Sequence, residues 1–386
     1  MCIDIRPLVD REGNSSAILA EFIRKALAGL AAGYQVVICC DHGISRSNAL
    51  AAAILSQFEK IPISEAVRRV LSATGNAEIR LEVLNSIRAT LEEDKLPPGK
   101  LGRQRWLLTG GSGYLGWALA NNAPENIDLL CPSHTELDLS EGAPAIDLFV
   151  RDNQVSRIVH FAAPHVGNTN SSFGKALVAL RNVLDTCVSN NLPLVLPSRW
   201  EVFSGYRGTE IRADELTPLR PSGVMGDTKF HSEKLVEAYI ERSRLRALIV
   251  RSGLVYGGRS APNFMRTFLK RALAGEDLYT HKYANGLPKL DLLHVDDWVS
   301  GCWSLMQSDL DGIYHCGTGN PVSTREVATV IMDSVAGTGS LKQLEIQDSF
   351  ANVALNSNKI KKAVGWTAKI TPRIGIPDFV KAYSID

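Results

Sequence analysis

The sequence predicts an α/β protein with two domains: a small α/β domain, then a doubly wound parallel sheet with a small C-terminal part. First, 386 residues exceed the length of one ordinary domain of about 150 residues. Second, the stretch 95–105 holds two prolines, two glycines and four basic residues, as a linker does. Third, apolar strands alternate with amphipathic helices after this stretch. We expect domains at 1–95 and 106–386, joined by 96–105.

Composition narrows the class of protein further. Hydrophobic residues make up 45% and charged residues 22%, which is typical of a globular chain. The formal net charge of +1 gives no reason to expect nucleic acid or a membrane as partner. No apolar run is long enough to span a bilayer, and the N-terminus lacks the pattern of a signal peptide. Seven scattered cysteines show no metal-ligand spacing. We expect a soluble, cytoplasmic protein without metal or disulfides.

The first domain is predicted from the apolar pattern before the linker. It indicates a first strand around Asp4, a helix, a strand over 34–39 and a helix over 47–58. Two further helices are expected to begin at Ile63 and Asn76. This order places a short loop between a strand and a helix N-terminus.

That loop has the residue types of an anion-binding cradle. Cys40 and Arg46 are separated by five residues, and the helix begins at Ser47. Five backbone amides and the helix N-terminus could surround a phosphate, which Arg46 would clamp with two hydrogen bonds. The same positive field favours the thiolate of Cys40, which is the form that attacks phosphorus. Ser47 could hydrogen-bond the sulfur and help it to leave.

The segment CCDHGISRS resembles the HCxxGxxRS signature of the protein tyrosine and dual-specificity phosphatases, and the resemblance extends to about residue 91. It implies a cysteine-dependent phosphatase with Cys40 as nucleophile. The family's general acid corresponds best to Asp10; Asp4 and Asp41 are weaker choices. Two features depart from the family, because Cys39 replaces the usual His and the region before the loop is short. A loop that only binds phosphate would have the same sequence.

The second domain opens on a strand, a glycine-rich turn and a helix, in the segment RWLLTGGSGYLGWALA. Gly110, Gly113 and Gly116 have the spacing that allows a tight turn, close approach to a pyrophosphate and close helix packing. Further strands are predicted in IDLLC, SRIVHFA, LPLVLPS and RALIVRS. This pattern predicts a Rossmann-type sheet that binds a dinucleotide.

About 280 residues from Arg105 onward resemble the extended short-chain dehydrogenase/reductases, the NAD-dependent sugar-nucleotide epimerases, dehydratases and reductases. The matching segments are TGGSGYLG, ELDLSE, RIVHFAA, LLHVDDWVSG, IYHCGTGNPVSTREVA and NSNKIKKAVGW. The resemblance implies NAD or NADP as cofactor, since no acidic residue follows IDLLC to select NAD. The residues that it implies for the cofactor are Thr109, Gly110, Gly111, Ser112, Gly113, Tyr114, Leu115, Gly116, Ala162, Ala163 and Lys229.

The catalytic positions depart from this family. Its members carry a Ser or Thr before a VYG-like element, and a Tyr four residues before a Lys. Here Arg199 takes the hydroxyl position and Met225 the Tyr position, while Lys229 remains. Methionine cannot exchange a proton, so Glu201 and Tyr206 are the candidate acid/base groups, unless they are a solvated carboxylate and a packing residue. Arg199 and Met225 are the candidate substrate-binding residues.

The leading interpretation is a bifunctional enzyme, in which a phosphatase-like domain is fused to a sugar-nucleotide epimerase/dehydratase-like domain. The alternative is a regulatory protein, in which a silent dinucleotide domain controls the phosphatase. A scaffold without turnover in either domain is a third reading. The expected partners are a phosphorylated small molecule or sugar nucleotide, with a phosphoprotein as a further option. The resemblance also implies a homodimer, paired through the helix after Lys229 and the helix over 176–188.

Overall fold

A computed structural model describes residues 1–8, 16–41, 43–61, 63–74, 79–80, 83, 86–87, 104–163, 169–258 and 263–383. These residues fall into two compact units. Unit 1 contains 1–105, 132–156 and 181–191, and unit 2 contains 106–131, 157–180 and 192–386. The predicted domain limits at 95 and 106 remain a prediction.

Unit 1 contains a pair of parallel strands and several helices. Strand β1 (Cys2–Asp4) pairs with β2 (Val37–Cys39), which places Asp4 opposite Cys39. Its buried core is formed by apolar side chains such as Ile3, Leu19 and Leu50. The helices of the unit are α1 (Ser16–Ala31), α2 (Arg46–Glu59), α3 (Ile63–Thr74) and α6 (Ala143–Asp152). The loop between β2 and α2 therefore lies at the end of a strand and before a helix N-terminus.

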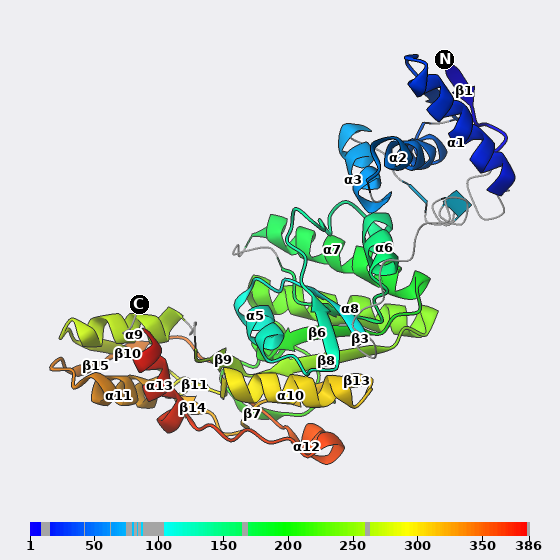
Figure 1. The fold of residues 1–386 in the computed structure, drawn as a ribbon. Helices are drawn as coiled ribbons and strands as arrows, with labels where there is room; N and C mark the ends of the chain where they lie inside the picture. The colour runs from blue at the N-terminus through cyan, green and yellow to red at the C-terminus, as the bar shows by residue number, and fades with distance from the viewer. Residues whose placement is uncertain are drawn as a thin grey trace. The chain divides into compact units, whose positions relative to one another are not determined.

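Unit 2 is built on a six-stranded sheet in the order β13-β8-β6-β5-β3-β4, of which Figure 1 labels β3, β6, β8 and β13. The strands are β3 (Gln104–Thr109), β4 (Ile127–Leu130), β5 (Arg157–His160), β6 (Leu194–Arg199), β8 (Ala247–Ser252) and β13 (Gly312–Cys316). The pairs β3–β5, β5–β6, β6–β8 and β8–β13 are parallel. The first strand in sequence, β3, has the second and third on either side. This reversal of strand order is the switch point at which doubly wound sheets bind ligands.

Helices cover both faces of this sheet, because successive side chains of a strand point to opposite sides. Val250 belongs to the core formed with α5 (Tyr114–Asn121) and α10 (Val295–Gln307), whereas Arg251 contacts Glu233 of α8 (Gly223–Ser243). Figure 1 shows α8 and α10 on either side of the strands. Helix α7 (Asn170–Ser189) connects β5 to β6.

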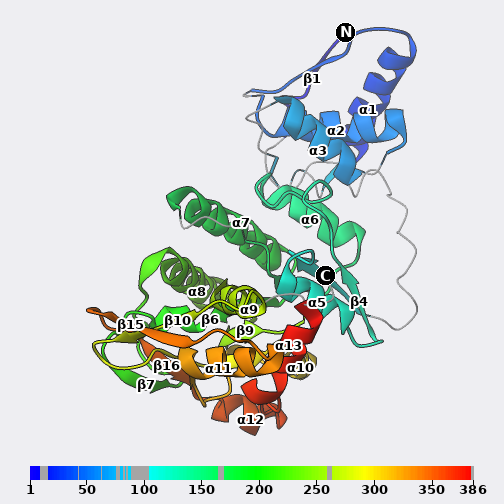
Figure 2. The same cartoon turned by 90° about the vertical axis from the view of Figure 1, so that its left-hand side faces the viewer.

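The smaller part of unit 2 is formed by most of the remaining elements, among which Figure 2 labels β10, β15, β16, α11 and α13. Its four-stranded sheet has the order β14-β11-β16-β7, and two further strand pairs are β10-β15 and β12-β9. The strands are β7 (Glu210–Ala213), β9 (Leu254–Tyr256), β10 (Leu278–Tyr283), β11 (Lys289–Leu290), β12 (Leu292–His294), β14 (Val322–Ser323), β15 (Leu341–Ile346) and β16 (Asn352–Leu355). The helices are η1 (Trp200–Phe203), α9 (Asn263–Leu273), α11 (Thr324–Val335) and α13 (Pro372–Tyr383). Helix α12 (Asn358–Val364) packs instead against β13 of the larger sheet and against α10.

The predicted parallel sheet is confirmed, and one predicted strand boundary is wrong. The strand predicted over 34–39 begins only at Val37, because the Tyr34 N–H bonds the Gly29 carbonyl and closes the end of α1. Strand β3 begins at Gln104, and the Arg105 carbonyl accepts the Ser156 N–H at 2.8 Å, while the linker predicted over 96–105 remains a prediction. The helix expected to begin at Asn76 lies outside the described residues.

Candidate functional site

The glycine turn connects β3 to α5 at the switch point of the sheet. Gly110 has a φ of +73°, and a Cβ there would lie 2.6 Å from the Ala162 nitrogen. A Cβ on Gly116 would collide with the Gly110 carbonyl. Gly113 differs from both, because it is exposed and a Cβ there would contact only the Gly110 carbonyl at 3.3 Å. Two of the glycines are thus needed by the fold. Gly113 bonds Gly110 and Trp117 through its own N–H and carbonyl, but it is exposed and has no side chain to fill the space at the helix N-terminus.

The end of β5 forms the other wall of this turn. Thr109 Oγ1 and His160 Nδ1 are 2.9 Å apart, and the Ala162 N–H donates to Thr109 Oγ1 at 3.3 Å. Ser112 and Ala163 are exposed next to these groups in sequence. The structure therefore brings the predicted cofactor residues Thr109, Gly110 and Ala162 together. Exposed backbone at a helix N-terminus fits a pyrophosphate.

Three other residues near the turn have defined places. The Tyr114 hydroxyl donates to the Gly257 carbonyl at 2.6 Å, and burial raises the pKa of this phenol. Leu115 packs against the core of the sheet. Cys131 follows β4, and a Cβ added at Gly111 would lie only 2.9 Å from the Cys131 Cβ. The side chains of Tyr114 and Leu115 thus hold the helix in place, so any part in cofactor binding falls to their backbone.

Burial of His160 makes the stability of this region sensitive to acid. Burial lowers the pKa of His160 to about 3, with a smaller effect from Lys229, and burial lowers that of His315 to about 3 as well. Both rings are neutral in the folded chain, whereas in the unfolded chain they bind a proton near pH 6.5. The free energy of unfolding should therefore fall as the pH drops below 6.5, by about 2 kcal/mol per histidine at pH 5.

Urea unfolding of the wild type and of His160→Asn between pH 7 and pH 5 measures this effect. We expect a shallower pH dependence for His160→Asn than for the control His281→Asn, because His281 is exposed. If the free energy of unfolding changed equally with pH in the two variants, His160 would not be the source of the acid sensitivity.

The predicted catalytic positions lie at the C-terminal end of β6 and on α8. Arg199 pairs with Glu201 through Nη2–Oε1 at 2.7 Å and Nε–Oε2 at 3.1 Å. Lys229 Nζ donates to the Pro197 carbonyl at 3.2 Å. Met225 stands one helical turn before Lys229, in the first turn of α8, with 44% of its surface exposed. Arg199, Glu201 and Lys229 influence one another electrostatically, so the structure brings these three together.

Tyr206 is engaged elsewhere. Its hydroxyl donates to the Pro218 carbonyl at 2.9 Å, and the Arg220 guanidinium lies 4.7 Å above its ring. These contacts hold a loop, which agrees with the packing role left open above. Sequence reasoning overlooked Ser198, whose buried hydroxyl has no partner among the described residues. The sequence signal that could have identified Ser198 as a candidate site residue is its place directly before Arg199, at the end of the apolar strand β6.

In unit 1, the structure brings Cys40, in the loop after β2, together with Ser47 in the first turn of α2. Cys40 Sγ donates to Ser47 Oγ at 3.3 Å and accepts the Gly43 N–H at 3.1 Å. The Asn48 side chain donates to the Gly43 and Ile44 carbonyls at 3.1 and 2.7 Å and so braces the loop. Asp10 lies outside the described residues.

Arg46 already has an internal acid as partner. Its Nη2 donates to Asp41 Oδ2 at 2.5 Å, and its Nη1 donates to the Leu8 carbonyl at 2.6 Å. A phosphate in this loop would compete with the Asp41 carboxylate for the guanidinium. Cys39, at the position of the family's His, contacts Cys2 with its Sγ 3.3 Å from that of Cys2. The hydrogen bond with Cys2 raises the pKa of the Cys39 thiol.

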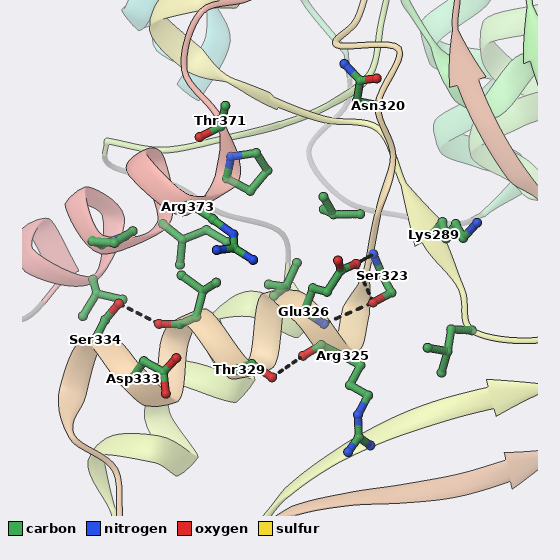
Figure 3. Close-up of a pocket in the computed structure, with 18 of the residues that line it drawn as sticks. Lys289, Asn320, Ser323, Arg325, Glu326, Thr329, Asp333, Ser334, Thr371 and Arg373 are labelled. Atoms are coloured by element: carbon green, nitrogen blue, oxygen red, sulfur yellow. Dashed lines mark hydrogen bonds between the residues drawn. The ribbon is translucent and has the colours of Figure 1, made fainter.

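A hollow of about 1190 Å³ lies in the smaller part of unit 2, between β14, α11 and α13 (Figure 3). Ser323 and Glu326 form a capping box at the start of α11, and hydrogen bonds from Ser323 lower the pKa of Glu326. Arg325 and Arg373 add positive charge to the lining. Neither the glycine turn nor Lys229 lines this hollow, so it is separate from the site described above.

Among the residues that the structure describes, no group of three or more His, Cys, Asp or Glu side chains has an arrangement that could hold a metal ion. None of the helices described is long and apolar enough to cross a membrane.

The sheet order, the glycine turn at its switch point and the lysine of α8 beside β6 define a Rossmann-type fold of the extended short-chain dehydrogenase/reductase class. Residues 104–358 match the family described as "RmlD substrate binding domain", and the chain belongs to this family. The match leaves out the Cys40 loop.

Several characterised proteins are similar to this chain. The low-salt glycan biosynthesis protein Agl12 of Haloferax volcanii is 28% identical over 252 residues, which cover 64% of this chain and 77% of the relative. The dTDP-D-glucose 4,6-dehydratase of Mus musculus is 26% identical over 337 residues, covering 76% and 92%. UDP-glucuronic acid decarboxylase 6 of Arabidopsis thaliana is 23% identical, covering 71% and 87%.

Solved structures share the fold. The dTDP-glucose 4,6-dehydratase of Bacillus anthracis, in complex with NAD, superposes with a TM-score of 0.64 at 21% identity and covers 73% of this chain and 97% of that one. The UDP-glucose 4-epimerase of Thermus thermophilus, in complex with NAD, gives 0.60 at 22%, covering 73% and 99%.

Proposed function

We propose that unit 2 is an enzyme that binds NAD or NADP and transforms the sugar of a sugar nucleotide. The observation that carries the proposal is the exposed position of Gly113, which has no side chain, at the switch point between a tight turn at Gly110 and the close packing at Gly116. Proteins similar to this chain include a dTDP-D-glucose 4,6-dehydratase and UDP-glucuronic acid decarboxylases.

The chain's own residues would bind the cofactor and the substrate in the following way. The amides at the start of α5 would hold the pyrophosphate, and Lys229 would reach the nicotinamide ribose or the substrate. The nicotinamide would accept and return hydride at a sugar carbon. Arg199 stands where the family has a Ser or Thr, and it would hold a phosphate or carboxylate of the substrate if Glu201 released it.

Two measurements test this proposal. Calorimetry with NAD and with NADP should show binding of at least one. Incubation with dTDP-glucose, UDP-glucose and UDP-glucuronate should then yield a changed sugar by mass spectrometry or a change in nicotinamide absorbance. Dinucleotide binding without any sugar-nucleotide chemistry would favour the regulatory reading, and absence of dinucleotide binding would refute the proposal. Pairing of two chains through α7 and α8 remains a prediction, which sedimentation at micromolar concentration tests.

We infer a second function for the Cys40 loop, because Cys40 Sγ, the Gly43 amide and Ser47 Oγ have the contacts that a thiolate nucleophile needs. The proposed activity is hydrolysis of a phosphate monoester on a small molecule or a protein. Attack of the Cys40 thiolate forms the S–P bond, and the leaving oxygen takes a proton, for which Asp10 is the candidate donor. Water then breaks the S–P bond and releases phosphate.

Substitutions in the loop should separate binding from hydrolysis. Cys40→Ser should abolish release of phosphate from an aryl phosphate and retain tungstate binding, whereas Arg46→Ala should weaken both. Asp41→Asn should tighten tungstate binding about tenfold, because it removes the carboxylate that competes for Arg46 Nη2 and the negative charge that repels the anion. Cys131→Ser is the matched control. If the wild type hydrolyses no aryl phosphate, and iodoacetamide modifies Cys40 no faster than Cys131, the loop is not a catalytic site.

A further inference from the structure

The proton-transferring group of unit 2 needs an assignment, because the family's tyrosine is absent. Met225 occupies its position, one turn before Lys229 on α8, and a thioether has no proton to exchange. Met225 is 44% exposed, so this turn of the helix opens to solvent and to a substrate. Lys229 lies below it with its Nζ at the C-terminal end of β6, 3.2 Å from the Pro197 carbonyl.

The other polar side chains at this end of β6 are already committed or unsuited. The Glu201 carboxylate accepts hydrogen bonds from Nε and Nη2 of Arg199, and the Tyr206 hydroxyl donates to the Pro218 carbonyl. Ser198 Oγ is buried without a partner among the described residues, but an unassisted hydroxyl does not titrate near neutral pH. The amine of Lys229 is therefore the best-placed group that can release and take up a proton.

The charges around Lys229 favour release of that proton. Burial of the ammonium and the positive charge of Arg199 lower the pKa of Lys229 to about 8, against the opposing effect of Glu201 and Glu233. His160, which faces it from β5, is neutral and adds no charge. General catalysis is most effective when the pKa of the group lies near the working pH.

We propose that Lys229 itself exchanges the proton of the substrate hydroxyl in unit 2, the task that a tyrosine performs in related enzymes. The inference rests on the proposed dinucleotide-dependent function. The substrate is a sugar nucleotide with a free secondary hydroxyl. In oxidation, the O–H bond breaks and its proton goes to the neutral Lys229 amine, while the hydrogen on carbon leaves as hydride to the oxidised nicotinamide. The alcohol becomes a ketone, and the ammonium returns the proton when the ketone is reduced.

The first test measures the proton on Lys229 without any turnover. Competitive acetylation of the intact protein, read by mass spectrometry as a function of pH, gives the midpoint at which each lysine becomes reactive. We expect a midpoint near pH 8 for Lys229, below that of Lys234 on the exposed side of the same helix. Arg199→Met should raise the Lys229 midpoint, whereas the exposed Arg207→Met should not. Equal midpoints for Lys229 and Lys234 would overturn the inference.

The second test uses the pH dependence of turnover. Oxidation of a sugar nucleotide by the wild type should rise with pH to a plateau above about pH 8. Lys229→Arg keeps the charge but cannot release its proton, so kcat should fall about 100-fold or more. Lys234→Arg is the matched control. Turnover by Lys229→Arg at the wild-type rate would refute the inference with the proposed function intact, whereas a wild type without sugar-nucleotide chemistry would refute that function.

Discussion

Replacing Gly113 by valine should weaken dinucleotide binding at least about 100-fold, a loss of about 2.7 kcal/mol of binding free energy, without unfolding the protein. Gly113 has φ −69° and ψ 160°, a conformation that a β-branched residue adopts readily. The new Cβ would contact only the Gly110 carbonyl at 3.3 Å, so a small shift accommodates it. The rest of the valine side chain would occupy space that we assign to the pyrophosphate. Calorimetry with NAD and NADP measures the loss.

The neighbouring glycines provide the comparison. Gly110→Val would need a positive φ and would clash with Ala162, and Gly116→Val would clash with the Gly110 carbonyl. Both should lower the melting temperature strongly, because backbone atoms cannot move aside. Ser112→Ala, at an exposed position, should preserve the fold. A Gly113→Val protein that folds and binds dinucleotide with wild-type affinity would show that the glycine turn is not the cofactor site.

Glu233→Ala should cost about 3–5 kcal/mol of unfolding free energy, because it leaves the charge of Arg251 buried without its partner. Arg251 of β8 and Glu233 of α8 are joined by contacts of 2.7, 3.1 and 3.1 Å. Their side chains are 2% and 0% exposed. His315 Nε2 lies 3.3 Å from the same guanidinium, and the ring is neutral because burial lowers its pKa. It cannot replace the lost negative charge.

Denaturant unfolding compares this variant with a matched control. Glu237→Ala removes a carboxylate from the same helix, but its pair with Lys234 is exposed, so the change should be below about 1 kcal/mol. Replacing both partners, as Glu233→Leu with Arg251→Met, should recover most of the lost stability. A Glu233→Ala protein as stable as Glu237→Ala would contradict the buried pair that joins α8 to the sheet.

The positions of the strands followed from sequence because hydrophobic runs of the right length between glycines and amphipathic helices are local signals. The turn from Thr109 to Gly116 was visible for the same reason, since the need for glycine arises within a few residues. Its contact with Ala162 was implied only through the family resemblance. Likewise, the spacing from Cys40 to Arg46 indicated an anion loop, but not that Asp41 pairs with the arginine.

The order of residues specifies which side chains are available at each strand end: glycines after β3, Arg199 at the end of β6, and Met225 followed by Lys229 on α8. The folded chain specifies what those side chains do. From the sequence alone, Tyr206 and Glu201 were both candidates for the acid or base. In the folded chain, the Tyr206 hydroxyl donates to the Pro218 carbonyl, and the Glu201 carboxylate pairs with Arg199. Hydrogen-bond partners and burial depend on groups distant in sequence, and these set the proton affinity of Lys229. Local pattern carries no information about such neighbours, so only the three-dimensional arrangement distinguishes a reactive side chain from one that holds a loop.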